Sequence, residues 1–127
     1  HAGVRFTVDA RLPGQLSVPD TELCALLSNG LENAIQAVSG LDEADRTVRL
    51  YCSVRLNKLL VEISNPCPQP PRMEDGIPAS SHGAGHGYGC RSIQTIARRR
   101  GGLCVFRAEG GEFQVQIMLP VKEQEAV

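Results

Sequence analysis

The strongest pattern in the sequence is an amphipathic segment between residues 20 and 40. Its apolar side chains recur every three or four residues, as on one face of an α-helix, at Leu23, Leu27, Leu31, Ala34, Ile35 and Val38. Glu22, Asn29, Asn33 and Gln36 fall on the opposite face. Asp20 or Thr21 suits the N-cap, and Ser39-Gly40 suits the end. A helix with one apolar face must pack against a second layer, so the chain is expected to build a layered domain around it.

Alternating apolar and polar residues predict strands in the rest of the chain. They cover residues 4–10, 48–55, 59–65, 103–105 and 113–119, with turns at Asn57-Lys58 and Glu109-Gly110-Gly111. Asn65 has the parity of Leu59, Val61 and Ile63, so it should point to the covered face of the sheet where its strand ends. A second, short helix from Cys90 is stopped by Gly101-Gly102.

The predicted order is therefore β, α, β, β, long loop, α, β, β. This order indicates an α/β protein of the α+β kind, a two-layer sandwich with one mixed, mostly antiparallel sheet and helices on one face. A length of 127 residues fits a single domain, residues 1–127. The sequence starts with His1 rather than Met, and we expect it to be a fragment of a longer chain.

Charge and cysteine content exclude some classes of function. With 13 basic and 14 acidic residues the net charge is -1, so no nucleic-acid partner is expected, and no apolar run reaches the length of a membrane span. Four cysteines lie in apolar periodic segments and no CxxC pair occurs, so these four should be buried thiols of a reducing compartment: Cys24, Cys52, Cys90 and Cys104.

Residues 66–86 show no periodicity and contain five prolines and three glycines. A structureless stretch of this length in a compact domain is usually functional or disordered. It leads into Gly85, Gly87 and Gly89 at the start of the second helix. Glycines allow close backbone approach to a ligand, and a helix N-terminus attracts phosphate. The pattern is neither a P-loop nor a dinucleotide fingerprint, because no Gly-Lys-Ser/Thr occurs and no strand leads into the glycines.

Asn29 and Asn33 lie one helical turn apart, on the same stripe. An amide oxygen is a hard, neutral ligand that suits one coordination position of Mg²⁺. Asparagine also costs helix stability, which argues against two solvated asparagines at these positions.

These motifs resemble those of the GHKL (gyrase, chaperone, histidine kinase, MutL) ATPases. Leu26–Ala37, LLSNGLENAIQA, is similar to their N-box, and Gly85–Ile93, GHGYGCRSI, is similar to their second glycine box. The likeness is greatest to the short catalytic domains of peptide-sensing sensor histidine kinases. It implies a sandwich of the Bergerat type that binds ATP and Mg²⁺, with residues of about 66–86 as the ATP lid.

The resemblance also implies a role for each matching residue. Asn33 matches the Mg²⁺ ligand. Asn29 matches the catalytic position that is acidic in hydrolysing members; an amide there cannot act as a general base for water, which favours a kinase. Asn65 matches the position that contacts the adenine amine. The phosphate-contacting, cofactor-binding glycines are Gly85, Gly87 and Gly89. The sequence departs from the family at the first glycine box, since residues 65–69 contain no glycine, and no clear F-box is found.

The resemblance implies transfer of the γ-phosphoryl group of ATP to a histidine on a separate dimerisation domain of the same protein. A response regulator would act downstream, the full-length protein would be a homodimer, and this domain would be the cytoplasmic part of a membrane-anchored protein. Two alternatives stay open: an anti-sigma-type serine kinase on the same fold, and a degenerate, nucleotide-free interaction module.

Overall fold

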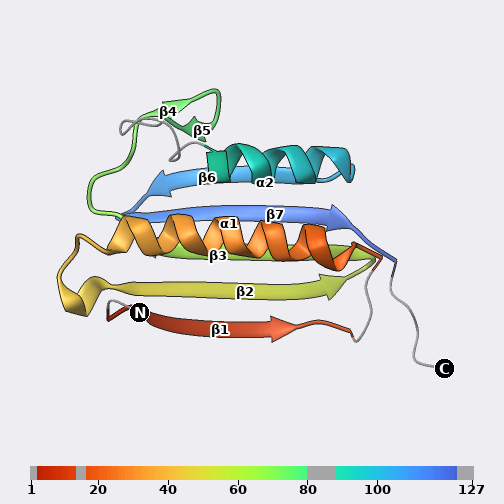
Figure 1. The fold of residues 1–127 in the computed structure, drawn as a ribbon, viewed down its shortest axis with the longest axis horizontal. Helices are drawn as coiled ribbons and strands as arrows, with labels where there is room; N and C mark the ends of the chain where they lie inside the picture. The colour runs from red at the N-terminus through yellow and green to blue at the C-terminus, as the bar shows by residue number, and fades with distance from the viewer. Residues whose placement is uncertain (1–2, 14–16, 80–87, 123–127) are drawn as a thin grey trace.

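The computed structural model describes residues 3–13, 17–79 and 88–122 (Figure 1). Its elements in chain order are β1 (Arg5–Arg11), α1 (Asp20–Val38), the 3-10 helix η1 (Glu43–Asp45), β2 (Thr47–Arg55), β3 (Lys58–Pro66), β4 (Met73–Glu74), β5 (Ile77–Pro78), α2 (Tyr88–Arg99), β6 (Leu103–Glu109) and β7 (Glu112–Pro120). No helix in these ranges is long and apolar enough to cross a membrane.

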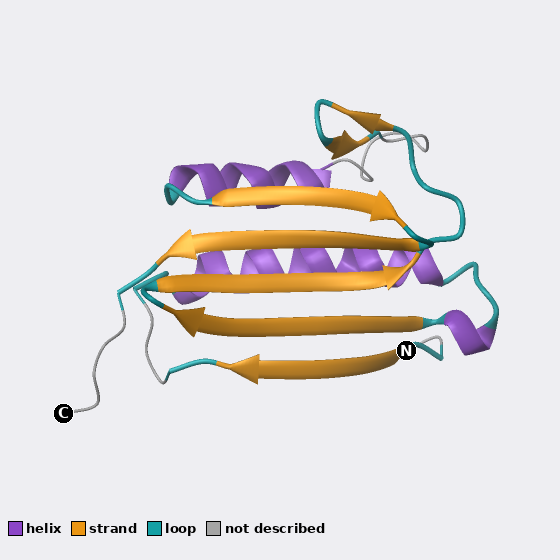
Figure 2. Ribbon diagram, turned by 180° about the vertical axis from the view of Figure 1, so that it is seen from behind, coloured by secondary structure: helices purple, strands orange, loops and turns teal. Residues whose placement is uncertain are grey.

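The main sheet has the strand order β1-β2-β3-β7-β6. Only the edge strand β1 pairs in parallel, with β2, and the other pairs are antiparallel. Both α-helices cover the same face, and the view from behind shows the opposite face without a helix over the described strands (Figure 2). The predicted two-layer α/β architecture with one mixed, mostly antiparallel sheet is therefore confirmed.

The core lies between the two helices and the three central strands, β2, β3 and β7. Its fully buried side chains alternate along β3, where Leu59, Val61 and Ile63 are at most 1% exposed. Gly30 of α1 lies directly over Ile63, and a Cβ on this glycine would collide with the Cδ1 atom of Ile63. The sheet and α1 are thus as close as a residue without a side chain permits.

The β2–β3 hairpin turns one residue earlier than predicted. Leu56 and Asn57 occupy its two central positions with φ of 52° and 60°, instead of Asn57 and Lys58. A two-residue hairpin requires positive φ at both positions, which asparagine tolerates and leucine rarely adopts. The predicted β6–β7 turn is confirmed at Gly110 and Gly111, with φ of 62° and 77°.

Two further expectations are wrong. The N-cap of α1 is Pro19, and no side chain caps the described helix, so neither Asp20 nor Thr21 has the predicted role. The segment after β3 is not structureless over its described part, residues 66–79, because β4 and β5 form a short hairpin there. Met73 and Ile77 of this hairpin pack against the core. The segment therefore has apolar contacts that its high proline content did not suggest.

We expect Gly102→Ala to destabilise the domain by about 1–3 kcal/mol, the usual cost of overpacking. A Cβ at Gly102 would collide with the backbone oxygen of Met118, and a backbone atom cannot swing aside as a side chain can. The control is Gly40→Ala, because a Cβ at Gly40 would have no described atom within 4 Å. Urea unfolding measures both variants, and equal free energies of unfolding would contradict the close contact.

Candidate functional site

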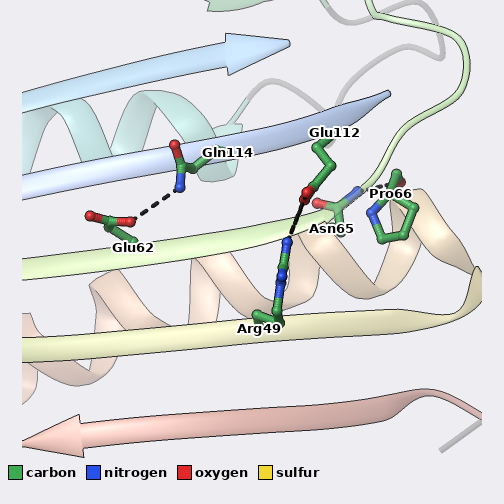
Figure 3. Close-up of polar contacts among 6 residues, drawn as sticks. All are labelled: Arg49, Glu62, Asn65, Pro66, Glu112 and Gln114. Carbon is green, nitrogen blue, oxygen red and sulfur yellow. Dashed lines mark hydrogen bonds and ion pairs between the residues drawn. The ribbon is translucent and has the colours of Figure 1, made fainter. Parts of the chain in front are cut away.

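Asn65 lies at the end of the central strand β3 and faces the helices, as its parity predicted. The residue is 2% exposed, although its side chain is polar. Its Nδ2 atom donates a 2.8 Å hydrogen bond to the backbone oxygen of Pro66 (Figure 3). Because this bond engages the nitrogen, the oxygen Oδ1 is the group with which the amide can accept a hydrogen bond from a ligand.

The backbone around Asn65 is held by the neighbouring strand. Asn65 is opposite Phe113 of β7, and the backbone nitrogen of Cys67 donates a 2.7 Å hydrogen bond to the oxygen of Gly111. The chain therefore leaves the sheet at a fixed point, directly beside the β6–β7 turn. From there it leads to the β4–β5 hairpin, which lies past the β6 edge of the sheet, near the start of α2 (Figure 1).

Asn29 of α1 lies beside the first turn of α2. A Cβ placed on Gly89 would be 3.7 Å from the backbone oxygen of Asn29 and 3.9 Å from its Cβ. Asn33 shares this flank of α1, one turn further on, and both asparagines are half-buried. The expectation that the amides lie opposite the core is wrong for Asn29, which lies against α2. Gly85 and Gly87, the other two predicted phosphate contacts, lie outside the described residues.

An ion pair that the sequence did not reveal joins the far ends of the two helices. Arg100, directly after α2, donates a 3.1 Å hydrogen bond from Nε to Glu22 of α1 and pairs with its second carboxylate oxygen through Nη2. The two side chains are 34% and 19% exposed, respectively. The hydrogen bond from Arg100 lowers the pKa of the Glu22 carboxyl and raises the pKa of the guanidinium. Since Glu22 is on the stripe of Asn29, this pair fixes the flank that faces α2.

A second group of polar side chains lies on the open face of the sheet. Arg49 donates hydrogen bonds of 2.8 and 2.5 Å to the two carboxylate oxygens of Glu112, and Gln114 donates one of 3.1 Å to Glu62 (Figure 3). Arg49, Glu62 and Gln114 border a shallow hollow of about 340 Å³. It lies across the sheet from Asn65 and both helices, so it is not part of the amide site.

All five cysteines lie in the described ranges and are free thiols. Cys52 and Cys90 are buried and Cys104 is half-buried, but Cys24 is exposed, so the prediction of burial is wrong for Cys24. Burial raises the pKa of Cys90 to about 11 and is the main reason that the pKa of Cys104 is raised to about 12. Both thiols therefore stay protonated and unreactive near neutral pH.

The described residues contain no group of three or more histidine, cysteine or acidic side chains that could hold a metal ion. The predicted ligand Asn33 is an amide and is therefore a single neutral donor. A metal ion beside it would need most of its ligands from water or from a bound phosphate group.

Comparison with known proteins agrees with the fold described above. The family model described as the GHKL domain matches residues 20–120, from the start of α1 to the end of β7. The chain belongs to the GHKL family. The matched range contains both helices, Asn65 and the glycines before α2, so the predicted resemblance is confirmed. No curated protein shows a significant match in sequence.

Several solved structures with the same fold come from histidine kinases. The catalytic domain of the histidine kinase ThkA, in a nucleotide-free form, matches with 18% identity and a TM-score of 0.65, over 94% of this chain and 80% of that one. The Acinetobacter baumannii histidine kinase AdeS matches with 15% identity and a TM-score of 0.67, over 94% and 55%. The histidine kinase domain of an Erythrobacter litoralis blue-light activated kinase matches with 21% identity and a TM-score of 0.65, over 94% and 52%. This GHKL domain thus spans about half of the latter two chains, and at these identities the likeness is one of fold.

We expect Glu22→Gln to weaken the acid dependence of stability. Arg100 lowers the pKa of Glu22 in the folded state, so the unfolded chain binds this proton more tightly. The carboxylate therefore stabilises the fold above its unfolded pKa of about 4.3, and this stabilisation is lost as the pH falls through the lower folded value. In urea unfolding between about pH 5 and pH 3, the free energy of unfolding should fall less steeply with decreasing pH for Glu22→Gln than for the wild type.

The control for this measurement is Glu32→Gln, on an exposed position of the same helix. Its pH dependence should resemble that of the wild type. Identical acid dependence in the Glu22→Gln variant and the wild type would show that the pair with Arg100 contributes nothing to folding.

Proposed function

We propose that this GHKL domain binds ATP with Mg²⁺ and transfers the γ-phosphoryl group to a histidine on a separate helical dimerisation segment of the same protein. The observation that carries the proposal is the position of three amides on the covered side of the sheet. Asn65 ends the central strand, Asn29 of α1 lies beside the first turn of α2, and Asn33 is one helical turn further along α1. The adenine ring, the metal ion and the phosphate groups of ATP would each have a binding partner of suitable chemistry on this side of the sheet.

Asn65 is suited to bind the adenine ring. Its oxygen can accept a hydrogen bond from the exocyclic amine, while the bond from Nδ2 to Pro66 keeps the amide in that orientation. At 2% exposure, a neutral amide also avoids the cost of burying a carboxylate. Asn65 would therefore recognise the adenine amine without a buried charge.

The phosphate groups would lie at the start of α2. The first turn of a helix has backbone N–H groups without helical partners and a partial positive charge, which favours an anion. Gly89 brings this turn close to Asn29 without a side chain between them. Gly85 and Gly87 would extend the cradle. Asn33 would hold Mg²⁺, and the ion, when bound, would neutralise negative charge on the phosphate oxygens.

The identity of residue 29 favours transfer to a histidine over hydrolysis. A general base must accept a proton from the attacking water, and the amide of Asn29 cannot do so. An imidazole needs no such help, because its unprotonated ring nitrogen is itself the nucleophile. It forms the N–P bond as the bond from the γ-phosphorus to the bridging oxygen breaks and ADP leaves, so positioning of the ring supplies much of the rate.

The partners follow from this chemistry. The phosphoacceptor histidine would lie on the dimerisation domain, the full-length protein would be a homodimer, and the phosphoryl group would pass to a response regulator. We also propose that this domain is the cytoplasmic part of a protein anchored in the cell membrane. Serine kinase activity and a nucleotide-free interaction role on the same fold are the alternatives that the two experiments below separate.

We expect Asn65→Ala to lower the affinity for ATP roughly tenfold, the effect of losing about one hydrogen bond. The affinity for inosine triphosphate should change much less, because that base has a carbonyl where adenine has its amine. Calorimetric titration measures both nucleotides. Ser64→Ala is the control, since Ser64 is adjacent in β3 but faces the open side. An equal loss of affinity for both nucleotides would show that Asn65 does not recognise the adenine amine. If the wild type does not bind ATP, the nucleotide-free interaction module is favoured.

We expect the domain alone to acquire no label from γ-labelled ATP, and to label an added helical segment that carries the phosphoacceptor histidine. The label should be acid-labile and base-stable, as a phosphoramidate is. Asn33→Ala should slow this transfer at least tenfold and remove most of its Mg²⁺ dependence. Gln36→Ala, on an exposed position of the same helix, should leave it unchanged. Acid-stable label on serine would identify the serine kinase instead, and rapid release of phosphate would identify a hydrolase.

A further inference from the structure

The edge strand β1 is exposed over its whole length. All seven of its residues are exposed, and on the side of the helices this includes Phe6 at 46% and Val8 at 60%. Neither helix reaches over β1, which lies at the far edge of the sheet from β6 (Figure 1). Edge strands are usually blunted by charged side chains, proline or a bulge. Arg5–Arg11 pairs with β2 in continuous register without a proline, and its charged residues, Arg5, Asp9 and Arg11, are of both signs.

The backbone of β1 determines which of its residues an additional strand would bond to. The backbone nitrogen of Arg5 donates a 2.8 Å hydrogen bond to Arg46, directly before β2, so Arg5 points its backbone groups inward. Successive residues of a strand alternate in this direction, as their side chains alternate between faces. Phe6, Val8 and Ala10 therefore present N–H and C=O groups to the outside, where the described residues provide no further strand.

We propose that β1 pairs antiparallel with β1 of a second copy of this chain, about a twofold axis at Thr7. In this register Phe6 is opposite the partner's Val8 as a hydrogen-bonded pair, and the reverse pair is equivalent. Arg5 is opposite the partner's Asp9, again twice. The sequence Arg-Phe-Thr-Val-Asp is thus complementary to itself in both polarity and charge. A twofold interface requires this self-complementarity.

Other registers fit less well. A shift by one residue would place an outward-facing residue opposite an inward-facing one, and the hydrogen bonds would not form. An axis at Val8 restores the bonding pattern but sets Arg5 opposite the partner's Arg11, and like charges in directly opposite positions are destabilising. An axis at Phe6 leaves both Arg5 and Asp9 without an opposite charge. The register about Thr7 alone joins apolar pairs with ion pairs.

The interface would be small, because it consists of one strand from each copy. It lies below the area of standard stable complexes, so we expect dissociation on the order of 0.1–1 mM for the isolated domain. If another part of the protein already holds two copies together, a much larger fraction of the β1 strands would be paired, because tethering supplies a high effective concentration. The contact would then act as a second, separable connection between catalytic domains.

Disulfide trapping tests the register. All variants contain Cys24→Ser, which removes the exposed native thiol. Thr7→Cys places two thiols in a closely spaced pair, with Cα atoms about 4.5 Å apart, within disulfide reach. Asp9→Cys places them four residues apart along the strands, about 13 Å, which is out of reach. Under mild oxidation the Thr7→Cys chain should therefore form a covalent dimer and the Asp9→Cys chain and the Cys24→Ser parent should not.

Sedimentation up to millimolar concentration tests the ion pairs and the edge. Asp9→Arg should weaken association at least tenfold, and the swap Arg5→Asp with Asp9→Arg should restore it. Val8→Pro should abolish it, because it removes an outward N–H and leaves the bonds to β2. Arg107→Gln, on the opposite edge strand β6, is the control and should have little effect, whereas Arg11 itself pairs with Asp9 at 3.3 Å. Arg5 also donates hydrogen bonds to the backbone oxygens of Glu43 and Ala44, so the charge-swapped chain could fail to fold. In that case the Val8→Pro variant and the two cysteine variants, Thr7→Cys and Asp9→Cys, test the proposal.

Three results would overturn the proposal. The first is a chain that remains monomeric at every concentration and forms no Thr7→Cys dimer. The second is an association that Val8→Pro leaves intact, which would place the contact elsewhere, for example at β6. The third is trapping of Asp9→Cys but not of Thr7→Cys, which would exclude the register about Thr7.

Discussion

Gly30 of α1 packs against Ile63 of the central strand, and the position of the candidate site depends on this packing of the helix on the sheet. A Cβ at Gly30 would collide with Ile63 of β3 and would lie 3.9 Å from Ile93 of α2. One glycine therefore lies where the central strand and both helices meet. Asn29 is its neighbour in sequence, so the close packing that requires glycine also places the Asn29 amide beside the first turn of α2.

Core packing also determines the position of Asn65. The alternation that buries Leu59, Val61 and Ile63 also turns Asn65 into the covered layer, one residue before the chain leaves the sheet. A polar residue among these positions is tolerable because Pro66 satisfies its nitrogen. Core packing and the proposed recognition of adenine would thus use one strand, with the apolar positions first and the amide at its end.

Much of this arrangement follows from periodicity in the sequence. The order of strands and helices and the direction of Asn65 were predictable, because they depend only on local alternation. Positions that depend on neighbours were not. The helical stripe groups Asn29 with Glu22, but only packing shows that this stripe faces α2 and Arg100. The turn at Leu56 was missed because leucine rarely adopts positive φ, and there the strand register overrides that preference.

The exposed face of β1 follows from the width of the two layers. Strands lie about 4.8 Å apart and packed helices about 8–10 Å apart, so two helices cover about four strands. Since α2 lies over the β6 and β7 edge, the uncovered strand is β1, at the opposite edge from the start of α2 (Figure 1). Pairing of two sheets through β1 would leave Asn65 and the flank of Asn29 free in both copies. The proposed nucleotide binding and the proposed pairing through β1 would therefore involve no common residue.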